Sequence, residues 1–421
     1  MKILWITNVM FPDVCRYMGI SQPISGGWLF ARAKQLAQIN DITLSVATVY
    51  KGRHLIELEI ENIHYYLLPV RRMDTYQKSL EQFWGDICRS FQPDIVHING
   101  TEYPFGLACM RAYRDTKYVV SIQGLVSVIA RYYFGGISVR EILMTTNPVE
   151  LLSGRSMFSG KRNMGKRGKY ETECILRADL ISGRTTWDLA HVRSISPQVQ
   201  YHYCSRTLRD IFYESPKWSI EKKKRYSIFL SKGTSPFKGL HIAIKAAAIL
   251  KAEYPEIIIR IAGKDMLKRS SWKDKLKFNG YQRYILKLVK ELKLFNNIQF
   301  TGPLSEQQVA MELLDSHIFV CPSSIENSSN SIAEAQILGV PTVASDVGGN
   351  MDMVEHGISG FIYRFEEVEL LAHYIKLIFD NDNIAIMLSA HAIKAAEMRH
   401  DRQNNLIADN EMYKMINNGD A

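Results

Sequence analysis

The chain has 421 residues, of which 46% are hydrophobic and 23% charged, with 52 basic against 43 acidic residues. This length predicts two domains of about 200 residues each, and the composition excludes a disordered or fibrous protein. No apolar run approaches the roughly 18 residues of a membrane span, and Met1-Lys2 leads directly into a predicted strand, so we expect a cytoplasmic protein. The six cysteines are scattered without CxxC or metal-ligand spacing, which predicts reduced thiols.

Short apolar runs alternate with helical patterns over the first 200 residues. Trp28–Ile39 and Phe105–Tyr113 carry apolar residues at helical spacing. Strand–helix–strand order predicts a doubly wound parallel sheet. The predicted strands are Lys2–Thr7, Ile42–Ala47, Ile63–Leu68, Ile95–Ile98, Tyr118–Ile122, Leu180–Ser182 and Val199–Tyr203.

A basic segment, Leu151–Tyr170, contains six Lys or Arg residues and no acid. Such a segment is suited to peripheral contact with anionic lipid headgroups at the inner face of a membrane, or to a lipid-diphosphate acceptor. It is equally compatible with a solvated flexible loop. Nucleic acid is disfavoured as a partner, because few aromatic residues interleave with the charges and no reader motif is present.

The alternation restarts after Ser215-Pro216 and a charged run, Glu221–Arg225. We therefore predict a first domain at 1–210 and a second at 211–397, with a polar helical tail from about 398 to 421 that could pack back on the first domain. Two such domains would place a cleft between the carboxyl ends of their sheets. The predicted elements of this half are strands Tyr226–Leu230, Ile257–Ala262, Ile298–Phe300, Ile318–Val320 and Thr342–Ser345, and helices Leu240–Ala252, Tyr281–Leu292 and Glu306–Leu314.

Two carboxylates, Glu326 and Glu334, flank a helix predicted to open at Ser331. Ser331 and Glu334 have the S-x-x-E spacing of a capping box, so Glu334 could serve only to start the helix. Glu326 has no such local role, and an anion in this loop must be solvated or accept hydrogen bonds from a ligand. Hydroxyl-rich sugars supply such donors.

Backbone amides at the start of this helix, over residues 327–331, favour a phosphate group. Gly348-Gly349 follows the next strand and either admits a ligand close to the backbone or forms only a turn. Lys238, just before a helix, could hold a diphosphate, although surface lysines are common there. Gly26-Gly27 opens a helix and offers a backbone cradle, but the motif is not GxGxxG, which disfavours a dinucleotide oxidoreductase.

His97 ends a predicted strand, where histidine is more often structural than catalytic. Gln123 ends the next strand and is kept as a candidate catalytic residue, together with Glu326 and Lys238. Asp380 and Asp382 have DxD spacing but fall at a helix end beside turn residues. We expect no metal site and no resident cofactor.

In chain order, these motifs resemble the GT-B glycosyltransferases of family 4, of the glycosyl transferases group 1 type, and their surface-polysaccharide subgroup. The residues that carry the resemblance are Gly26-Gly27, PDIVHING, GRTTWD at 183–188, PFKGLH at 236–241, Ala262-Gly263, TGPLS at 301–305 and the E-x7-E segment. The resemblance implies an α/β protein with two Rossmann-like domains facing a central cleft. It also implies retaining transfer of a sugar from a UDP- or GDP-sugar to a glycan or lipid-linked acceptor, without a metal.

The resemblance also implies residue roles. Glu326 would contact the donor sugar, Glu334 the ribose hydroxyls, and Gly26-Gly27 the reacting centre. The diphosphate would be held by Lys238 and by the amides of Asn330, Ser331 and Ile332.

The chain departs from the family pattern at two positions. Gly233 stands where many members have Arg, leaving Lys232 as a substitute, and Gln123 stands where many have His. These departures keep two alternatives open, a non-catalytic nucleotide-sugar or glycan-binding protein and a sugar-nucleotide epimerase.

Overall fold

The computed structural model describes residues 1–21, 27–268 and 278–418, and the chain divides into two compact units. The first unit comprises Met1–Val128, Met164–Arg209 and His400–Ala421. The second comprises Ile129–Asn163 and Asp210–Arg399. Residues 129–163, which the sequence analysis placed in the first domain, therefore belong to the second unit. Their contacts are made by tertiary packing and leave no local sequence pattern.

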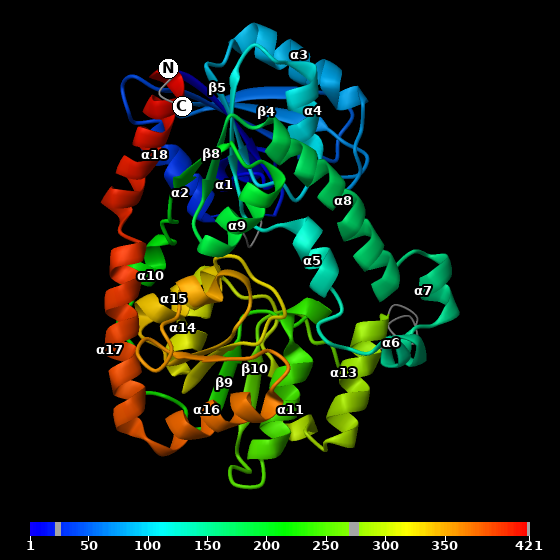
Figure 1. Cartoon of the computed structure of the whole chain (residues 1–421), viewed down its shortest axis with the longest axis vertical. Helices are drawn as coiled ribbons and strands as arrows, with labels where there is room; N and C mark the ends of the chain where they lie inside the picture. Colours follow the sequence, from blue (N-terminus) through cyan, green and yellow to red (C-terminus); the bar gives the residue numbers. More distant parts are fainter. Residues whose placement is uncertain (22–26, 269–277, 419–421) are drawn as a thin grey trace. The chain divides into compact units, whose positions relative to one another are not determined.

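The first unit is built on an eight-stranded sheet in the order β3-β4-β2-β1-β5-β6-β7-β8 (Figure 1). Its pairs are parallel except for β3, which runs antiparallel to β4 and was not predicted. The predicted doubly wound sheet is confirmed. The strands are β1 (Lys2–Thr7), β2 (Thr43–Tyr50), β3 (Ile56–Ile60), β4 (Ile63–Pro69), β5 (Ile95–Asn99), β6 (Lys117–Ser121), β7 (Leu180–Gly183) and β8 (Gln200–Tyr203).

The C-terminal helix, α18 (Arg402–Asn418), lies against α2 of the first unit (Figure 1). Its Tyr413 hydroxyl accepts a hydrogen bond from Trp5 Nε1 at 2.8 Å. Its Asp409 forms an ion pair with Arg32. The other helices of this unit are α1 (Pro12–Tyr17), α2 (Gly27–Leu36), α3 (Ser79–Phe91), α4 (Phe105–Ala112) and α9 (Thr186–Ile195), and two helices, α5 (Val126–Tyr132) and α8 (Met157–Arg177), run across the division between units.

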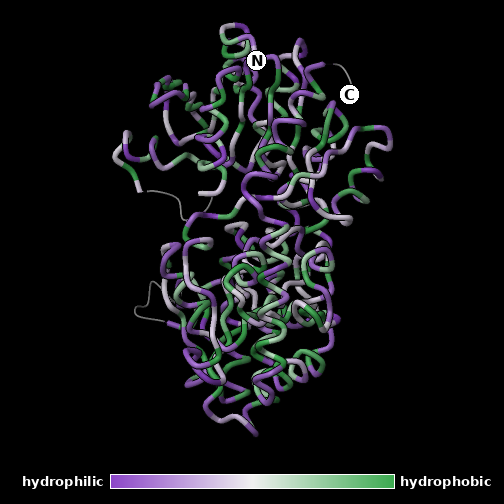
Figure 2. Tube along the Cα trace, turned by 90° about the vertical axis from the view of Figure 1, so that its left-hand side faces the viewer, coloured by the Kyte–Doolittle hydropathy of each residue, from purple (hydrophilic) through white to green (hydrophobic). Residues whose placement is uncertain are grey.

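The second unit contains a six-stranded parallel sheet in the order β11-β10-β9-β12-β13-β14. Strands β9, β12 and β13 are buried along their whole length, as expected when helices cover both faces of a parallel sheet. In Figure 2 the hydrophobic segments of this unit gather at its centre. The strands are β9 (Ser227–Leu230), β10 (Ile258–Ile261), β11 (Ile298–Phe300), β12 (Ile318–Cys321), β13 (Thr342–Ser345) and β14 (Phe361–Tyr363), of which β14 was not predicted.

The helices of the second unit come from both of its sequence segments. From the first segment come α6 (Val139–Thr145) and α7 (Pro148–Leu152). From the second come α10 (Asp210–Glu214), α11 (Leu240–Leu250), α13 (Gly280–Glu291), α14 (Glu306–Asp315), α15 (Asn330–Leu338), α16 (Val368–Asp380) and α17 (Asp382–Arg399), with 3-10 turns η1 (Pro236–Lys238), η2 (Phe295–Asn297) and η3 (Gly348–Asp352).

The basic segment 151–170 is mostly helical, because α8 starts at Met157 and continues to Arg177. The reading of this segment as a flexible loop is wrong for that part. Within the described ranges, no helix combines the length and hydropathy that crossing a membrane requires.

Candidate active site

The second sheet reverses its strand order between β9 and β12, which are adjacent although two strands separate them in sequence. In open parallel sheets, ligands bind outside the carboxyl ends of the strands at such a switch point. Here β9 leads into residues 231–239 and β12 into residues 322–329. These two segments carry Lys232, Lys238 and Glu326, three of the site residues predicted from the sequence.

Lys238 and Glu326 meet at this point of the sheet. Lys238 Nζ donates to Glu326 Oε1 at 2.5 Å, and Ser323 Oγ donates to the same oxygen at 2.7 Å. The two charged side chains are 24% and 14% exposed. Burial opposes the ammonium charge, yet the Glu326 carboxylate outweighs it and raises the pKa of Lys238. The Lys238 ammonium is therefore stabilised by the neighbouring carboxylate.

Lys232 and Glu334 lie in the same electrostatic cluster. The pKa of Lys232 is lowered by desolvation and by the Lys238 ammonium, while Glu326 and Glu334 act in the opposite direction. Two ammonium groups that repel each other favour an anion between them, and a diphosphate is such an anion. The structure thus brings together all four charged residues that the sequence analysis assigned to the donor.

Helix α15 begins at Asn330, with Ser329 at the N-cap position. Glu334 is consequently the fifth helical residue and cannot form the predicted capping box with Ser331, which is only the second. The interpretation of Glu334 as a capping residue is therefore wrong, and Glu334 does not start the helix. Glu334 is buried, with 7% of its surface exposed.

The first three helical amides of α15 belong to Asn330, Ser331 and Ile332. Such amides have no carbonyl partner within a helix, and the Ser329 side chain makes no capping hydrogen bond here. Ser231 Oγ donates to Ser331 Oγ at 2.7 Å and so ties the end of β9 to the start of α15. Sequence reasoning missed Ser231 and Ser323, whose only sequence signal is their place directly after a strand at the switch point.

Gly348 and Gly349 pack against the backbone of Glu326. Gly348 has φ +57°, and a Cβ at this position would lie 1.7 Å from the Glu326 carbonyl oxygen. Gly349 donates its N–H to the same carbonyl at 3.2 Å. The pair is thus more than a turn, since it holds the Glu326 loop in place.

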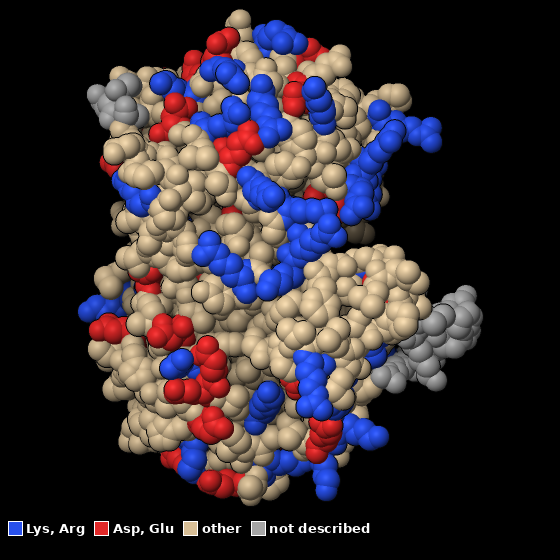
Figure 3. Space-filling model, turned by 45° about the vertical axis from the view of Figure 1, so that its right-hand side comes forward, with Lys and Arg blue, Asp and Glu red and all other residues tan. Residues whose placement is uncertain are grey.

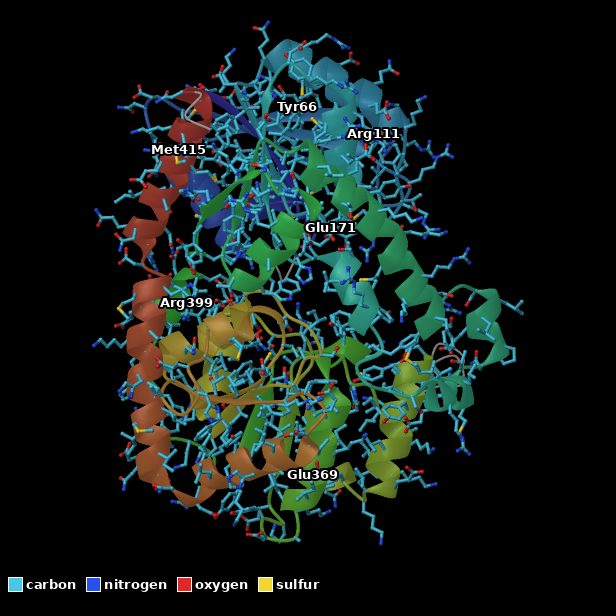
Figure 4. The ribbon with its side chains drawn as sticks, viewed as in Figure 1. Tyr66, Arg111, Glu171, Glu369, Arg399 and Met415 are labelled. Carbon is cyan, nitrogen blue, oxygen red and sulfur yellow. The ribbon has the colours of Figure 1, made fainter. Side chains whose placement is uncertain are left out.

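Arg399, the last residue of α17, stabilises η3, the 3-10 turn that contains these two glycines. Arg399, labelled in Figure 4, donates through Nη2 to the Asp352 carbonyl at 2.9 Å and through Nη1 to the Met353 carbonyl at 3.3 Å. The guanidinium therefore fixes the end of η3.

Gly233, where the resembled family often has Arg, is enclosed by apolar side chains. A Cβ here would lie 2.9 Å from Leu240 Cδ2 and 3.0 Å from Ile261 Cγ2. A guanidinium at this position would have to displace Leu240. Lys232, which is exposed, is the adjacent residue that supplies positive charge.

The first sheet has its own switch point between β1 and β5. Asn8 follows β1 and its Nδ2 donates to Glu102 Oε2, after β5, at 2.6 Å. Both side chains crowd Gly100, where a Cβ would lie 2.4 Å from Glu102 Oε2 and 2.6 Å from Asn8 Nδ2. Desolvation raises the pKa of Glu102 despite the Asn8 hydrogen bond and the charges of Arg184 and Arg167. Sequence reasoning missed this pair.

Gln123 lies close to the same edge of the first sheet. Its Nε2 donates to the Asn99 carbonyl at 2.9 Å. The segment after Gln123 is held by Glu171 of α8, labelled in Figure 4, whose carboxylate accepts from the amides of Val126 and Ser127 at 2.9 and 3.0 Å. Desolvation raises the pKa of Glu171 to about 7.

The remaining predicted positions have the following outcomes. Gly26 lies outside the described residues, and Gly27 is the first residue of α2. His97 is fully buried and bonds Tyr413 through Nδ1 and Ser121 through Nε2, so it is structural.

The DxD pair is engaged elsewhere, with Asp380 bonded to Tyr254 and Asp382 paired with Lys223. Among the described residues, no group of three or more His, Cys, Asp or Glu side chains is placed to hold a metal ion.

Comparison with known proteins follows the division into units. Residues 211–399 match the family of glycosyl transferases group 1. A 2-deoxystreptamine N-acetyl-D-glucosaminyltransferase of Niallia circulans is 31% identical over 104 residues, covering 25% of this chain and 27% of the relative. A D-inositol 3-phosphate glycosyltransferase of Thermobispora bispora is 26% identical over 195 residues, covering 44% of each chain. The chain thus aligns with less than half the length of these curated relatives.

The fold likeness extends over the whole chain. The solved structure of Anabaena Alr3699/HepE in complex with UDP and glucose has a TM-score of 0.68 at 16% identity, covering 98% of this chain and 99% of that one. At this identity the likeness shows the fold alone. The chain has the GT-B fold of two Rossmann-like units, and residues 211–399 of its second unit match the family of glycosyl transferases group 1.

Proposed function

We propose that the chain is a retaining glycosyltransferase that moves a sugar from a UDP- or GDP-sugar to a glycan or lipid-linked acceptor in bacterial polysaccharide biosynthesis. The observation that carries the proposal is the cluster of Lys238, Glu326, Lys232 and Glu334 beside the first amides of α15, at the switch point of the second sheet. Cations and helix amides suit a diphosphate, and carboxylates suit hydroxyl groups.

Each group then has a role. Lys238, Lys232 and the amides of Asn330, Ser331 and Ile332 stabilise the negative charge that develops on the diphosphate as the bond to the anomeric carbon breaks. Glu334 accepts hydrogen bonds from the ribose hydroxyls.

Glu326, kept in place by the glycine pair, accepts hydrogen bonds from the donor sugar. The acceptor oxygen bonds to the anomeric carbon on the face that the diphosphate leaves, and its proton passes to the departing phosphate oxygen. The configuration at the anomeric carbon is retained.

The comparisons support the proposal at the level of reaction class. The two curated relatives are named as glycosyltransferases, and the Alr3699/HepE structure holds UDP and glucose. The base and sugar of this chain's donor, its acceptor and its cytoplasmic location remain predictions.

The test begins with a thermal-shift screen of UDP, GDP, ADP and their sugars against the full chain. A nucleotide that raises Tm identifies the donor base, and its sugars are then incubated with an acceptor panel. We expect transfer, with the anomeric configuration of the product determined by NMR. A Tm shift without turnover would replace the proposal with a binding protein, and conversion of the donor without acceptor would replace it with an epimerase.

A further inference from the structure

Residues 129–163 form an arm, defined here as that range, that is firmly attached to the second unit although it comes from the first half of the sequence. Arg283 of α13 pairs with Glu150 and donates through Nε to the Thr145 carbonyl at 2.5 Å. His241 Nε2 donates to the Gly135 carbonyl at 2.7 Å. In Figure 1, α6 and α7 lie at the edge of this unit beside α13. These contacts attach the inner side of the arm to the rest of the second unit.

The outer side of the arm is apolar. Leu143, Met144 and Leu152 are 58%, 65% and 90% exposed. Val139, Val149 and Leu151 are exposed as well, while Ile142 and Glu150 point inward. Six exposed large apolar side chains within 14 residues of sequence are unusual for a surface that only meets water.

Basic residues outnumber acidic ones in the arm. Its acidic residues are Glu141 and Glu150, and both are engaged, the first with Ser138 in a capping box and the second with Arg283. Arg140, Arg155 and Arg162 are exposed, and Lys161 lies over the Phe134 ring at 4.7 Å. Figure 3 shows both basic (blue) and acidic (red) side chains on the face of the molecule that it presents. Exposed apolar side chains together with exposed basic groups complement a surface of anionic headgroups over hydrocarbon.

We propose that the outer face of α6 and α7 binds the surface of an anionic lipid bilayer, with Leu143, Met144 and Leu152 entering the headgroup–acyl boundary and Arg140, Arg155 and Arg162 contacting the headgroups. A second copy of the chain is a poorer occupant, because its equivalent face carries the same positive charge. The inference does not depend on sugar transfer, since the arm would dock whether or not the chain is an enzyme.

Vesicle co-sedimentation tests the proposal. The full chain is mixed with vesicles of phosphatidylcholine alone or of phosphatidylcholine with phosphatidylglycerol, at low and high salt. We expect sedimentation with the anionic vesicles that weakens as salt rises. The variant L143S/M144S/L152S should lose about tenfold or more in partition coefficient, because exposed side chains that enter the bilayer are removed. R140Q/R155Q/R162Q should lose both binding and its salt dependence.

A matched control places serines on exposed apolar residues elsewhere in the same unit. Met311 and Ile386 are 57% and 47% exposed, and M311S/I386S should bind vesicles as the parent chain does. Nucleotide-induced Tm shifts should be equal in all variants, which separates this result from failure of the proposed function.

Two outcomes would overturn the proposal. One is that the parent chain sediments with neither vesicle, or that the triple serine variant binds as well as the parent. The other is a parent dimer in sedimentation velocity that the triple serine variant converts to a monomer, because the face would then bind a second copy.

Discussion

Replacing Lys238 with Met, which keeps most of the apolar stem and removes the ammonium, tests the site most directly. Exposed ion pairs contribute about 0–1 kcal/mol, and breaking a buried pair costs about 3–5 kcal/mol. Lys238 and Glu326 are 24% and 14% exposed, which places this pair between the two cases. We therefore expect the free energy of unfolding to fall by about 2 kcal/mol, because the Glu326 side chain loses its ion-pair partner.

The effect on activity should be larger than the effect on stability. Removing one preorganised group that stabilises developing charge lowers turnover by about 100- to 1,000-fold, which corresponds to about 3–4 kcal/mol in the transition state. The assay is kcat/KM for sugar transfer, measured well below the unfolding midpoint. A stability cycle with E326Q and the double variant should give a coupling energy of about 1–2 kcal/mol.

A control of similar stability cost separates folding from chemistry. Lys223 lies 3.3 Å from Asp382 Oδ1 in an ion pair of the same unit, and its side chain is 2% exposed. K223M should lose stability and keep its kcat/KM. If K238M transfers sugar at the parent rate, the diphosphate role of Lys238 is wrong. If the cycle shows no coupling, the ion pair does not form in solution.

Three further results are expected. E334Q should weaken nucleotide binding by about tenfold in calorimetry and change Tm little, because Glu334 starts no helix; unchanged affinity would remove it from the site. G348A should cost more than about 2 kcal/mol in urea unfolding, since its Cβ would meet a backbone carbonyl, whereas G357A, with φ +75° and open space, should cost about 1 kcal/mol; equal costs would contradict the close packing. Burial lowers the pKa of His241 to about 4, so the unfolded chain takes up the proton first as the pH falls below about 6.5. Stability should therefore drop by about 2 kcal/mol between about pH 7 and pH 5, and H241Q should lose this part of the slope; an unchanged slope would refute the assignment.

Most strands could be predicted from the sequence, because strands buried in a parallel sheet are continuous apolar runs. β1 and β13 have the predicted bounds, since burial on both faces imposes the same residue types along each strand. The strands that were missed, β3 and β14, lie at the edges of their sheets. β3 is mostly not buried and β14 has only three residues, so neither strand gives a long apolar run in the sequence.

The start of α15 shows where local reasoning failed. Ser331 and Glu334 fit a capping box by spacing, but the helix begins one residue earlier, at Asn330. Ser331 is instead hydrogen-bonded to Ser231, 100 positions away in the sequence. The residue at which α15 begins depends on the path of the chain after β12 and on its contact with the residue that follows β9. A local sequence motif does not contain these contacts.

The sequence by itself determined the two parallel-sheet units and the residue types of the donor cluster, because strand burial and the loops after strands leave local patterns. Only the tertiary structure decided that Lys238 neutralises Glu326, that Gly348 seats the Glu326 loop, and that residues 129–163 belong to the second unit. Each of these depends on atoms brought together from distant positions. Packing selects such contacts through distance and shape, and neither quantity is recorded in the spacing of residues along a chain.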